Sequence, residues 1–320
     1  MENKKTIFWV AVALFVTVFT VVAGFAFNII PSLSSGSKLN GIRYDLDFTK
    51  ESDLENVKQI YVKVLSSNTH ITNTSSSTLK AVLSGHIISS NPKVVPTIEI
   101  KKEGDTLFLS EIREENLTLV FSSNARLDIA LPDKFTGHLN FDGSSGNLYA
   151  SALTLQSFDA EVRSGDINLG KLELNEALNF KSGSGNIKVD SIHAKSITMT
   201  SRSGEQSIGT ISAAESISLK STSGNQDFNS INCNEATIEA LSGNITVNSV
   251  NSQNLIVNST SGNVSIKGFE GNCDIKASSG NITLYSDKPL KQIAADARSG
   301  NVKIYLPETS EFKLDAFASS

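Results

Sequence analysis

Polar and apolar residues recur along most of this chain with a period of about nineteen positions. Each repeat contains Ser-Gly followed by a polar residue. The glycines of these phrases are Gly146, Gly165, Gly185, Gly204, Gly224, Gly243, Gly262, Gly280 and Gly300. Nine copies at nearly constant spacing identify a repeat protein. Counting a degenerate first copy near Ser122-Ser123-Asn124, the array covers residues 117–320.

Three apolar stretches in each repeat predict three inward faces. The first lies two and four positions after the glycine, as Ile187 and Val189 do on either side of a polar residue. Only Gln206 and Gln226 interrupt its leading column. The second lies seven positions after the glycine, and the third lies seven and five positions before the next glycine. Such alternation is typical of strands with one buried face.

Stacked coils would join these faces into one core. A single coil cannot bury its apolar side chains, so each strand is expected to pair in parallel with the equivalent strand of the next coil. The pattern therefore predicts an all-β protein, a right-handed single-stranded parallel β-helix with about 19 residues per coil.

The repeated corner is interpreted as a joint of the scaffold, with a repeated ligand site as the alternative. Glycine adopts positive φ without a Cβ clash, and asparagine is the next most tolerant residue. Stacked asparagines can also hydrogen-bond from coil to coil. The expected ladder consists of Asn147, Asn186, Asn225, Asn244, Asn263, Asn281 and Asn301, with Asp166 and Glu205 as exceptions.

The first forty residues predict a membrane anchor. Residues 7–30 form a run of 24 residues without a charge, preceded by Lys4 and Lys5. A helix of that length spans ~36 Å, enough to cross a hydrocarbon core of ~30 Å. The charge asymmetry places residues 1–6 in the cytoplasm and the C-terminal domain outside the cell, after a spacer at 31–40. A cleaved secretory signal is the alternative, although its apolar run is usually shorter.

Residues 41–116 lack the repeat but alternate as strands, with a hairpin expected at Glu103-Gly104-Asp105. A solenoid needs its first coil covered, since an open edge is a pairing template. This region is therefore predicted to be an N-terminal β cap. The C-terminal end shows no such cap, which leaves a partner or a second copy to cover it.

Composition narrows the function classes. The formal net charge is −5, without the concentrated basic face that nucleic acid requires. Only 7% of the residues are aromatic, which is typical of many short strands and tight turns rather than a large globular core.

The phrases SGDINLG (164–170) and SGNIKVD (184–190), and strands ending in DIALP (128–132) and KIYLP (303–307), resemble a bacterial family of candidate adhesins. The resemblance covers most of the chain after about residue 55. With one N-terminal span, the layout is similar to the LiaG-like membrane proteins of Gram-positive cell-envelope stress operons. The family implies a surface-exposed β-helix of undefined activity and supplies no catalytic residues.

Catalytic, metal and covalent-anchoring signals are weak. Leu306-Pro307-Glu308-Thr309-Ser310 approaches a sortase signal but lacks its glycine, apolar span and basic tail. The four histidines have no metal spacing, so neither a metal nor a cofactor is expected. Cys233 and Cys273 lie two coils apart, too far for a disulfide, so two separate thiols are predicted, Cys273 in the core.

The sequence favours a binding or structural role at the cell surface over enzymatic activity. Expected partners are the membrane, cell-wall polymer or another surface protein. The preferred binding face is the outward column that carries Lys188, Asp227, Thr246, Thr283 and Lys303. The alternative is a carbohydrate-active enzyme, a polysaccharide lyase or hydrolase, whose carboxylates would come from Asp142, Asp159, Glu161 and Asp166.

Overall fold

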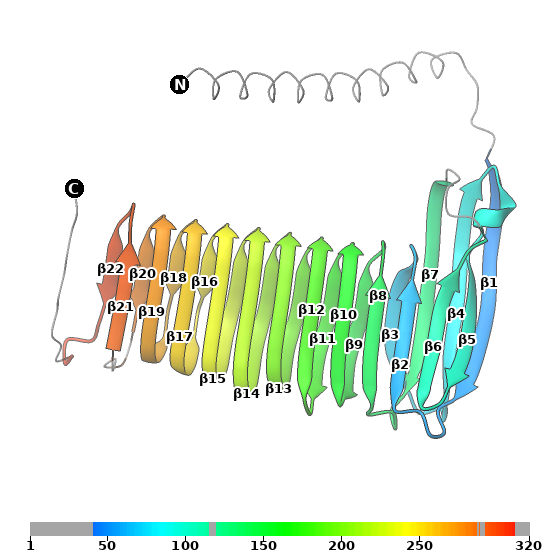
Figure 1. Cartoon of the computed structure of the whole chain (residues 1–320), viewed down its shortest axis with the longest axis horizontal. Coiled ribbons are helices and arrows are strands. Elements are labelled where there is room, and N and C mark those ends of the chain that lie inside the picture. Colours follow the sequence, from blue (N-terminus) through cyan, green and yellow to red (C-terminus); the bar gives the residue numbers. More distant parts are fainter. Residues whose placement is uncertain (1–40, 115–119, 287, 289–291, 311–320) are drawn as a thin grey trace, which may run out of the picture.

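The computed structural model describes residues 41–114, 120–286, 288 and 292–310. These residues form strands, turns and one short 3-10 helix, η1 (Pro92–Val94). Figure 1 shows a long rod of stacked coils with the N-terminal strands at one end. The strands of the rod are β8 (His138–Gly143), β9 (Leu148–Leu155), β10 (Ser157–Ser164), β11 (Ile167–Leu174), β12 (Ala177–Ser184), β13 (Ile187–Ser203), β14 (Gln206–Ser223), β15 (Gln226–Ser242), β16 (Ile245–Val247), β17 (Val250–Ser261), β18 (Val264–Ile266), β19 (Phe269–Ser279), β20 (Ile282–Tyr285), β21 (Gln292–Ala297) and β22 (Val302–Tyr305).

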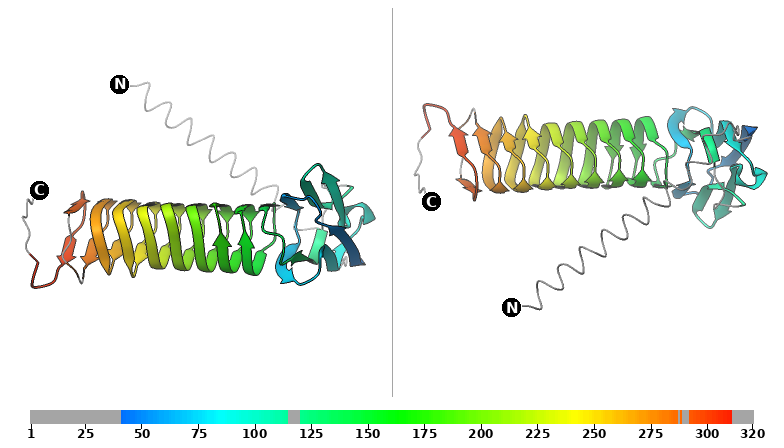
Figure 2. Two further views of the ribbon diagram at one scale, coloured as in Figure 1. Left: turned by 90° about the horizontal axis from the view of Figure 1, so that it is seen from below. Right: turned by 90° about the horizontal axis from the view of Figure 1, so that it is seen from above.

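The coils pair in parallel, in the register that the repeat predicts. Within β8–β22 every pairing of the described residues is parallel, and equivalent positions of successive repeats are partners, as Val264 and Ile282 are. The coils follow one another along the rod in both views of Figure 2. The prediction of an all-β solenoid with about 19 residues per turn is therefore confirmed.

The inward columns form one continuous hydrophobic core. Ile187, Val247 and Ile266 are completely buried, each in the first strand after a corner. Burying an aliphatic side chain of this size contributes roughly 1.5–3 kcal/mol relative to leaving it exposed. Because every coil repeats the contribution, stacking rather than a compact globular centre stabilises the fold.

Gln206 and Gln226 occupy the inward column instead of leaving it. Both side chains are fully buried and lie on neighbouring coils. Gln206 Nε2 donates to the Lys220 carbonyl oxygen at 3.0 Å, and Gln226 Nε2 donates to that of Glu239 at 2.9 Å. These bonds satisfy the two amide nitrogens, whereas both Oε1 atoms are buried without a hydrogen-bond partner among the described residues, so each glutamine fits the apolar column with its amide half satisfied.

The last described coil is open. Val302 and Ile304 continue the inward column in sequence but are 40% and 37% exposed, because no further described coil lies beyond β22. The prediction that these two side chains are buried is therefore wrong, and only for this coil. Tyr305 stacks on Tyr285 of the preceding coil, with ring centroids 4.4 Å apart.

The N-terminal strands adjoin the other end of the rod. They comprise β1 (Ile42–Asp53), β2 (Gln59–Val64), β3 (Asn68–Thr74), β4 (Thr78–Ser89), β5 (Thr97–Glu103), β6 (Thr106–Ile112) and β7 (Val120–Pro132). Strands β1, β4 and β7 pair antiparallel, and β5–β6 form the hairpin predicted at Gly104, whose φ is +63°. Strand β2 lies between β6 and β8, and β3 lies between β7 and β9, all in parallel.

The first corner of the solenoid is not where the sequence placed it. Ser122-Ser123-Asn124 lies within β7, where Asn124 is opposite His86 in an antiparallel pair, so no corner forms there. The corner below Gly146 is instead Ser66-Ser67-Asn68. It has no glycine, and Asn68 lies 79 positions before its ladder partner Asn147 instead of one period, so the repeat does not reveal it.

A buried carboxylate completes this first corner. Glu111 of β6 is 2% exposed, and its Oε2 accepts hydrogen bonds from the backbone N–H groups of Leu65, Ser66 and Ser67 at 3.0–3.2 Å. Its other oxygen is 3.3 Å from the guanidinium of Arg113. Glu111 thus provides the hydrogen-bond acceptor for these three backbone N–H groups, at a corner that is the first of the described stack.

The predicted membrane span at 7–30 and the spacer at 31–40 lie outside the described residues. Within the described part of the chain, no helix has the length and apolarity needed to cross a membrane.

Candidate binding surfaces

Each Ser-Gly corner combines a glycine conformation with a close backbone contact. The nine glycines have φ between +97° and +144°. At Gly224, for example, an added Cβ would lie 2.1 Å from the Gly204 carbonyl oxygen of the coil below. Both features exclude a side chain, so the stacking of the coils requires glycine at this position.

The asparagines after the glycines form a ladder from side chain to backbone. Asn244 Oδ1 accepts from the Asn263 N–H at 2.9 Å, and the same bond recurs between other successive coils. Asp166 takes part like an asparagine, accepting from the Asn186 N–H at 2.7 Å. Among the described corners, the series from Asn68 to Asn301 is interrupted only between Glu205 and Asn225.

The outward column proposed from the sequence is straight and in register. Lys188 lies beside Ser207, Asp227 beside Thr246, and Thr283 beside Lys303, each pair on adjacent coils. Lys188 and Lys303 are exposed, whereas Asp227, Thr246 and Thr283 are half-buried by their neighbours. The column is thus a polar ribbon in which the carboxylate of Asp227 lies between the two lysines.

Three of the four carboxylates considered for catalysis lie together. Asp142, Asp159 and Glu161 line one depression of about 210 Å³ on the outer face of β8, β10 and β12. Asp142 pairs with the Arg163 guanidinium at 3.5 Å, and Asp159 accepts from Asn179 Nδ2 at 2.5 Å. Asp166 belongs to the ladder instead. The described residues contain no group of His, Cys, Asp and Glu able to hold a metal ion.

Both thiols are free, as predicted. Cys273 is buried in the core, and burial raises its pKa to about 12. Cys233 is half-buried, and burial raises its thiol pKa as well, although its Sγ lies 3.7 Å from the Ser252 hydroxyl. Nucleophilic cysteines have lowered pKa values, so neither environment favours thiolate chemistry.

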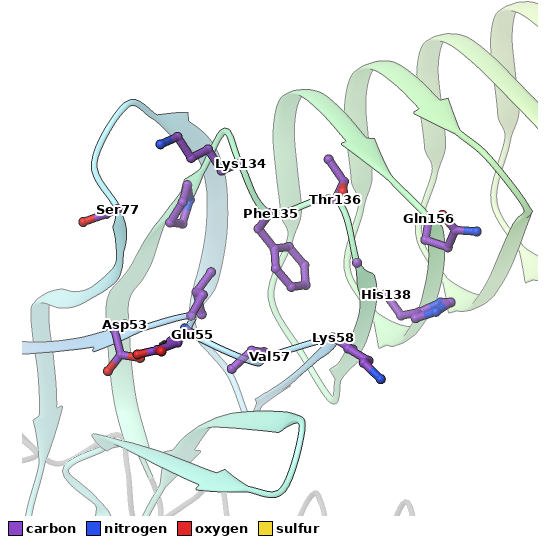
Figure 3. A pocket seen from close by; sticks show the side chains of 13 residues that line it. Asp53, Glu55, Val57, Lys58, Ser77, Lys134, Phe135, Thr136, His138 and Gln156 are labelled. Atoms are coloured by element: carbon purple, nitrogen blue, oxygen red, sulfur yellow. Dashed lines mark hydrogen bonds between the residues drawn. The ribbon is translucent and has the colours of Figure 1, made fainter.

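One pocket lies where the N-terminal strands meet the first coil (Figure 3). It has a volume of about 630 Å³, and Leu54, Val57 and Phe135 contribute its apolar surface. At its rim His138 Nδ1 is 2.8 Å from the Ser157 hydroxyl. A hydrogen bond from Lys102 lowers the pKa of the Asp53 carboxyl at the opposite rim. The pocket therefore combines an apolar surface with charged groups at its rim, an arrangement that suits binding of a small group.

A second set of depressions forms a lateral groove on the outer face of β10, β12, β13, β14, β15 and β17. It consists of two depressions of about 540 and 410 Å³, which share Thr200, Ser201 and Thr222. The sequence analysis missed this groove. The available signal was the position two residues before each corner glycine, which holds Arg163 and Arg202.

An all-β rod of parallel coils whose described pockets are open and shallow is a β-solenoid with extended polar faces. The chain belongs to the Toastrack DUF4097 family, whose model matches residues 57–216 and again residues 211–320. The first match begins just before β2, the strand that pairs with β8 of the rod. The family resemblance inferred from the repeated phrases is therefore confirmed.

Several solved structures match this chain at low identity and with TM-scores below 0.5. A "putative adhesin" from Parabacteroides distasonis is 12% identical with a TM-score of 0.48, and covers 83% of this chain and 98% of its own. A "putative adhesin" from Parabacteroides merdae is 15% identical with a TM-score of 0.41, over 82% and 98% of the two chains. A "putative lipid binding protein" from Parabacteroides distasonis is 17% identical with a TM-score of 0.36, over 82% and 97%. No curated protein matches the chain.

Proposed function

We propose that this protein displays a β-solenoid outside the cell as a binding rod for surface polymers. Residues 7–30 would anchor it by a single membrane span with the N-terminus in the cytoplasm, and residues 41–116 would cap the membrane-proximal end of a right-handed rod. The observation that carries the proposal is the register of the outer faces. Polar side chains such as Lys188, Thr246 and Thr283 repeat once per coil in straight columns.

A repeating polymer suits such a surface. Equivalent side chains on successive coils are ~4.8 Å apart, so one ligand chain lying along the rod contacts many coils at once. Individually weak contacts then add along the length. The abundance of hydroxyl and amide groups on these columns favours sugars and other polar polymers.

The binding role is tested with the full-length protein in nanodiscs. We expect retention on cell-wall sacculi, reduced in the double variant Lys188→Gln and Lys303→Gln, which removes both cations of the column. The matched control is Lys267→Gln, an exposed lysine elsewhere on the coil. Failure of the wild-type protein to bind any wall polymer would overturn the proposal.

The topology is tested separately. Protease added to intact cells should digest the solenoid of the full-length protein but spare a tag at residue 1. Digestion of that tag as well, or of neither part, would contradict the proposed anchor.

A second candidate function rests on Asp142, Asp159 and Glu161. Asp142 and Glu161 are partners on adjacent coils, and paired carboxylates hydrolyse glycosides when suitably spaced. Release of reducing ends from wall glycans, abolished in Glu161→Gln, would support an enzyme. Retention without products supports the binding rod.

The resemblance to envelope-stress proteins suggests a regulatory partner within the membrane. Replacing residues 7–30 with an unrelated span should then abolish an envelope-stress reporter response while polymer retention stays unchanged. An unchanged response would remove this part of the proposal.

A further inference from the structure

The larger depression of the lateral groove is a cluster of cations on an otherwise acidic protein. Its lining includes Arg163, Lys181 and Arg202, against the single carboxylate of Glu161. The three cations come from three successive coils, through β10, β12 and β13. The local charge is thus positive although the whole chain carries −5.

The position between the two arginines is a glycine that packs closely on the coil below. Gly183 lies next to the Arg163 backbone, and a Cβ there would be 2.4 Å from the Arg163 carbonyl oxygen. Register places Gly183 between Arg163 and Arg202, so the two Cα atoms are ~10 Å apart across a floor without a side chain. Thr200 and Thr222 add hydroxyl donors to the walls of the depression.

Two of the cations are available for a ligand. Arg163 donates to the Ser144 hydroxyl at 2.8 Å and pairs with Asp142. Lys181 and Arg202, by contrast, are exposed and have no ion-pair partner among the described residues. Further along the groove, Lys220 is held by Glu239 at 2.9 Å, so the uncompensated charge is concentrated in this one depression.

From this arrangement we infer an oxyanion subsite that holds a phosphate group of an extended polymer between Arg202, Lys181 and the threonine hydroxyls. Guanidinium groups bind phosphate through two parallel N–H donors, and lysine adds a point charge. The continuation of the groove toward β17 lets the polymer run along the rod on either side of the phosphate. The inference depends on the proposed function in one respect, namely that this face is displayed outside the cell.

The test uses full-length protein in nanodiscs of zwitterionic lipid, with short-chain inorganic polyphosphate as the probe. We expect salt-sensitive binding that weakens at least about tenfold in Arg202→Gln and in Lys181→Gln, as loss of a charge-assisted hydrogen bond predicts. The matched controls are Arg298→Gln and Lys267→Gln. Arg298 occupies the same position of its repeat as Arg202 but lies outside the groove. Thermal unfolding shows whether each variant retains the fold.

Three results would overturn the inference. These are absence of polyphosphate binding by the wild type, equal losses in the control variants, and preference for phosphatidylglycerol vesicles over polyphosphate. The third would assign the phosphate to a lipid headgroup. The wall-polymer assay distinguishes the two proposals, because retention that depends on Lys188 and Lys303 but not on Arg202 preserves the binding role and removes this subsite.

Discussion

At the scale of single residues, the corner glycines are constrained twice, by their positive φ and by the carbonyl oxygen of the coil below. The sequence pattern predicts the first constraint, because only the residue type is needed to infer it. The second depends on how closely successive corners stack, which only the structure gives. Gly104 is subject to the first constraint without the second, because its φ is +63° but a Cβ there would meet nothing within 4 Å.

Gly224→Ala is therefore expected to destabilise the protein by about 3 kcal/mol, since strain and steric overlap add. Gly104→Ala, with backbone strain alone, should cost about 1 kcal/mol. Urea unfolding of both variants measures the difference. Equal effects would mean that the contact with the Gly204 oxygen is readily relieved.

The gap in the asparagine ladder offers a stabilising substitution. Glu205→Asn should provide the missing acceptor for the Asn225 N–H and add about 1 kcal/mol of stability. Hydrogen exchange of the Asn225 amide should slow accordingly. Glu235→Asn removes the same charge away from the ladder and serves as the control, so an equal gain there would assign the effect to charge.

Cys273 predicts a pH dependence of stability. Its folded pKa of about 12 exceeds the ordinary 9.0, so between these values the unfolded chain binds fewer protons than the folded protein. The free energy of unfolding should fall as the pH rises above 9.0, by up to roughly 1.4 kcal/mol per pH unit from this group. Urea midpoints of Cys273→Ala should lack that contribution. Equal slopes of unfolding free energy against pH in the wild type and the variant would contradict this prediction.

At the scale of elements, the coil is the unit of folding and of design. Deleting residues 244–262 removes one whole period and brings Asn263 above Asn225, in the register of the ladder. We expect a cooperatively melting protein with an unchanged β-type circular dichroism spectrum. Deleting residues 244–253 removes about half a coil, leaves too little chain between Gly243 and Gly262 to complete a turn of the solenoid, and should abolish folding.

The elements also show which structural features can be predicted from the sequence. Ile187, Val247 and Ile266 could be assigned to the core because each recurs at a fixed distance from its glycine. Glu111 could not be assigned its role, since its carboxylate binds backbone groups about 45 residues away and no period links them. The lateral groove is an intermediate case, because only part of it could be predicted from the sequence. Arg163 and Arg202 follow the repeat, but packing decides that Arg163 pairs with Asp142 while Arg202 has no ion-pair partner among the described residues.

At the scale of the whole molecule, the two ends of the described rod differ. One end continues into the strands β1–β7, and Glu111 satisfies the first corner. The other leaves Val302 and Ile304 partly exposed. Such an end adds coils easily, which is how an array of this kind lengthens by duplication of one repeat.

The hydrogen bonds between coils run along the rod axis, and this has a mechanical consequence. If the rod is pulled from its two ends, each coil peels from its neighbour in turn instead of sharing the load by shear. Each event should lengthen the chain by about 60 Å, the span of nineteen extended residues less one coil spacing. Optical-tweezer traces of the tethered protein should therefore show a series of small, equal steps at low force, whereas a single large rupture would contradict this. A surface rod of this design would lengthen gradually under tension, because its coils would unfold one after another.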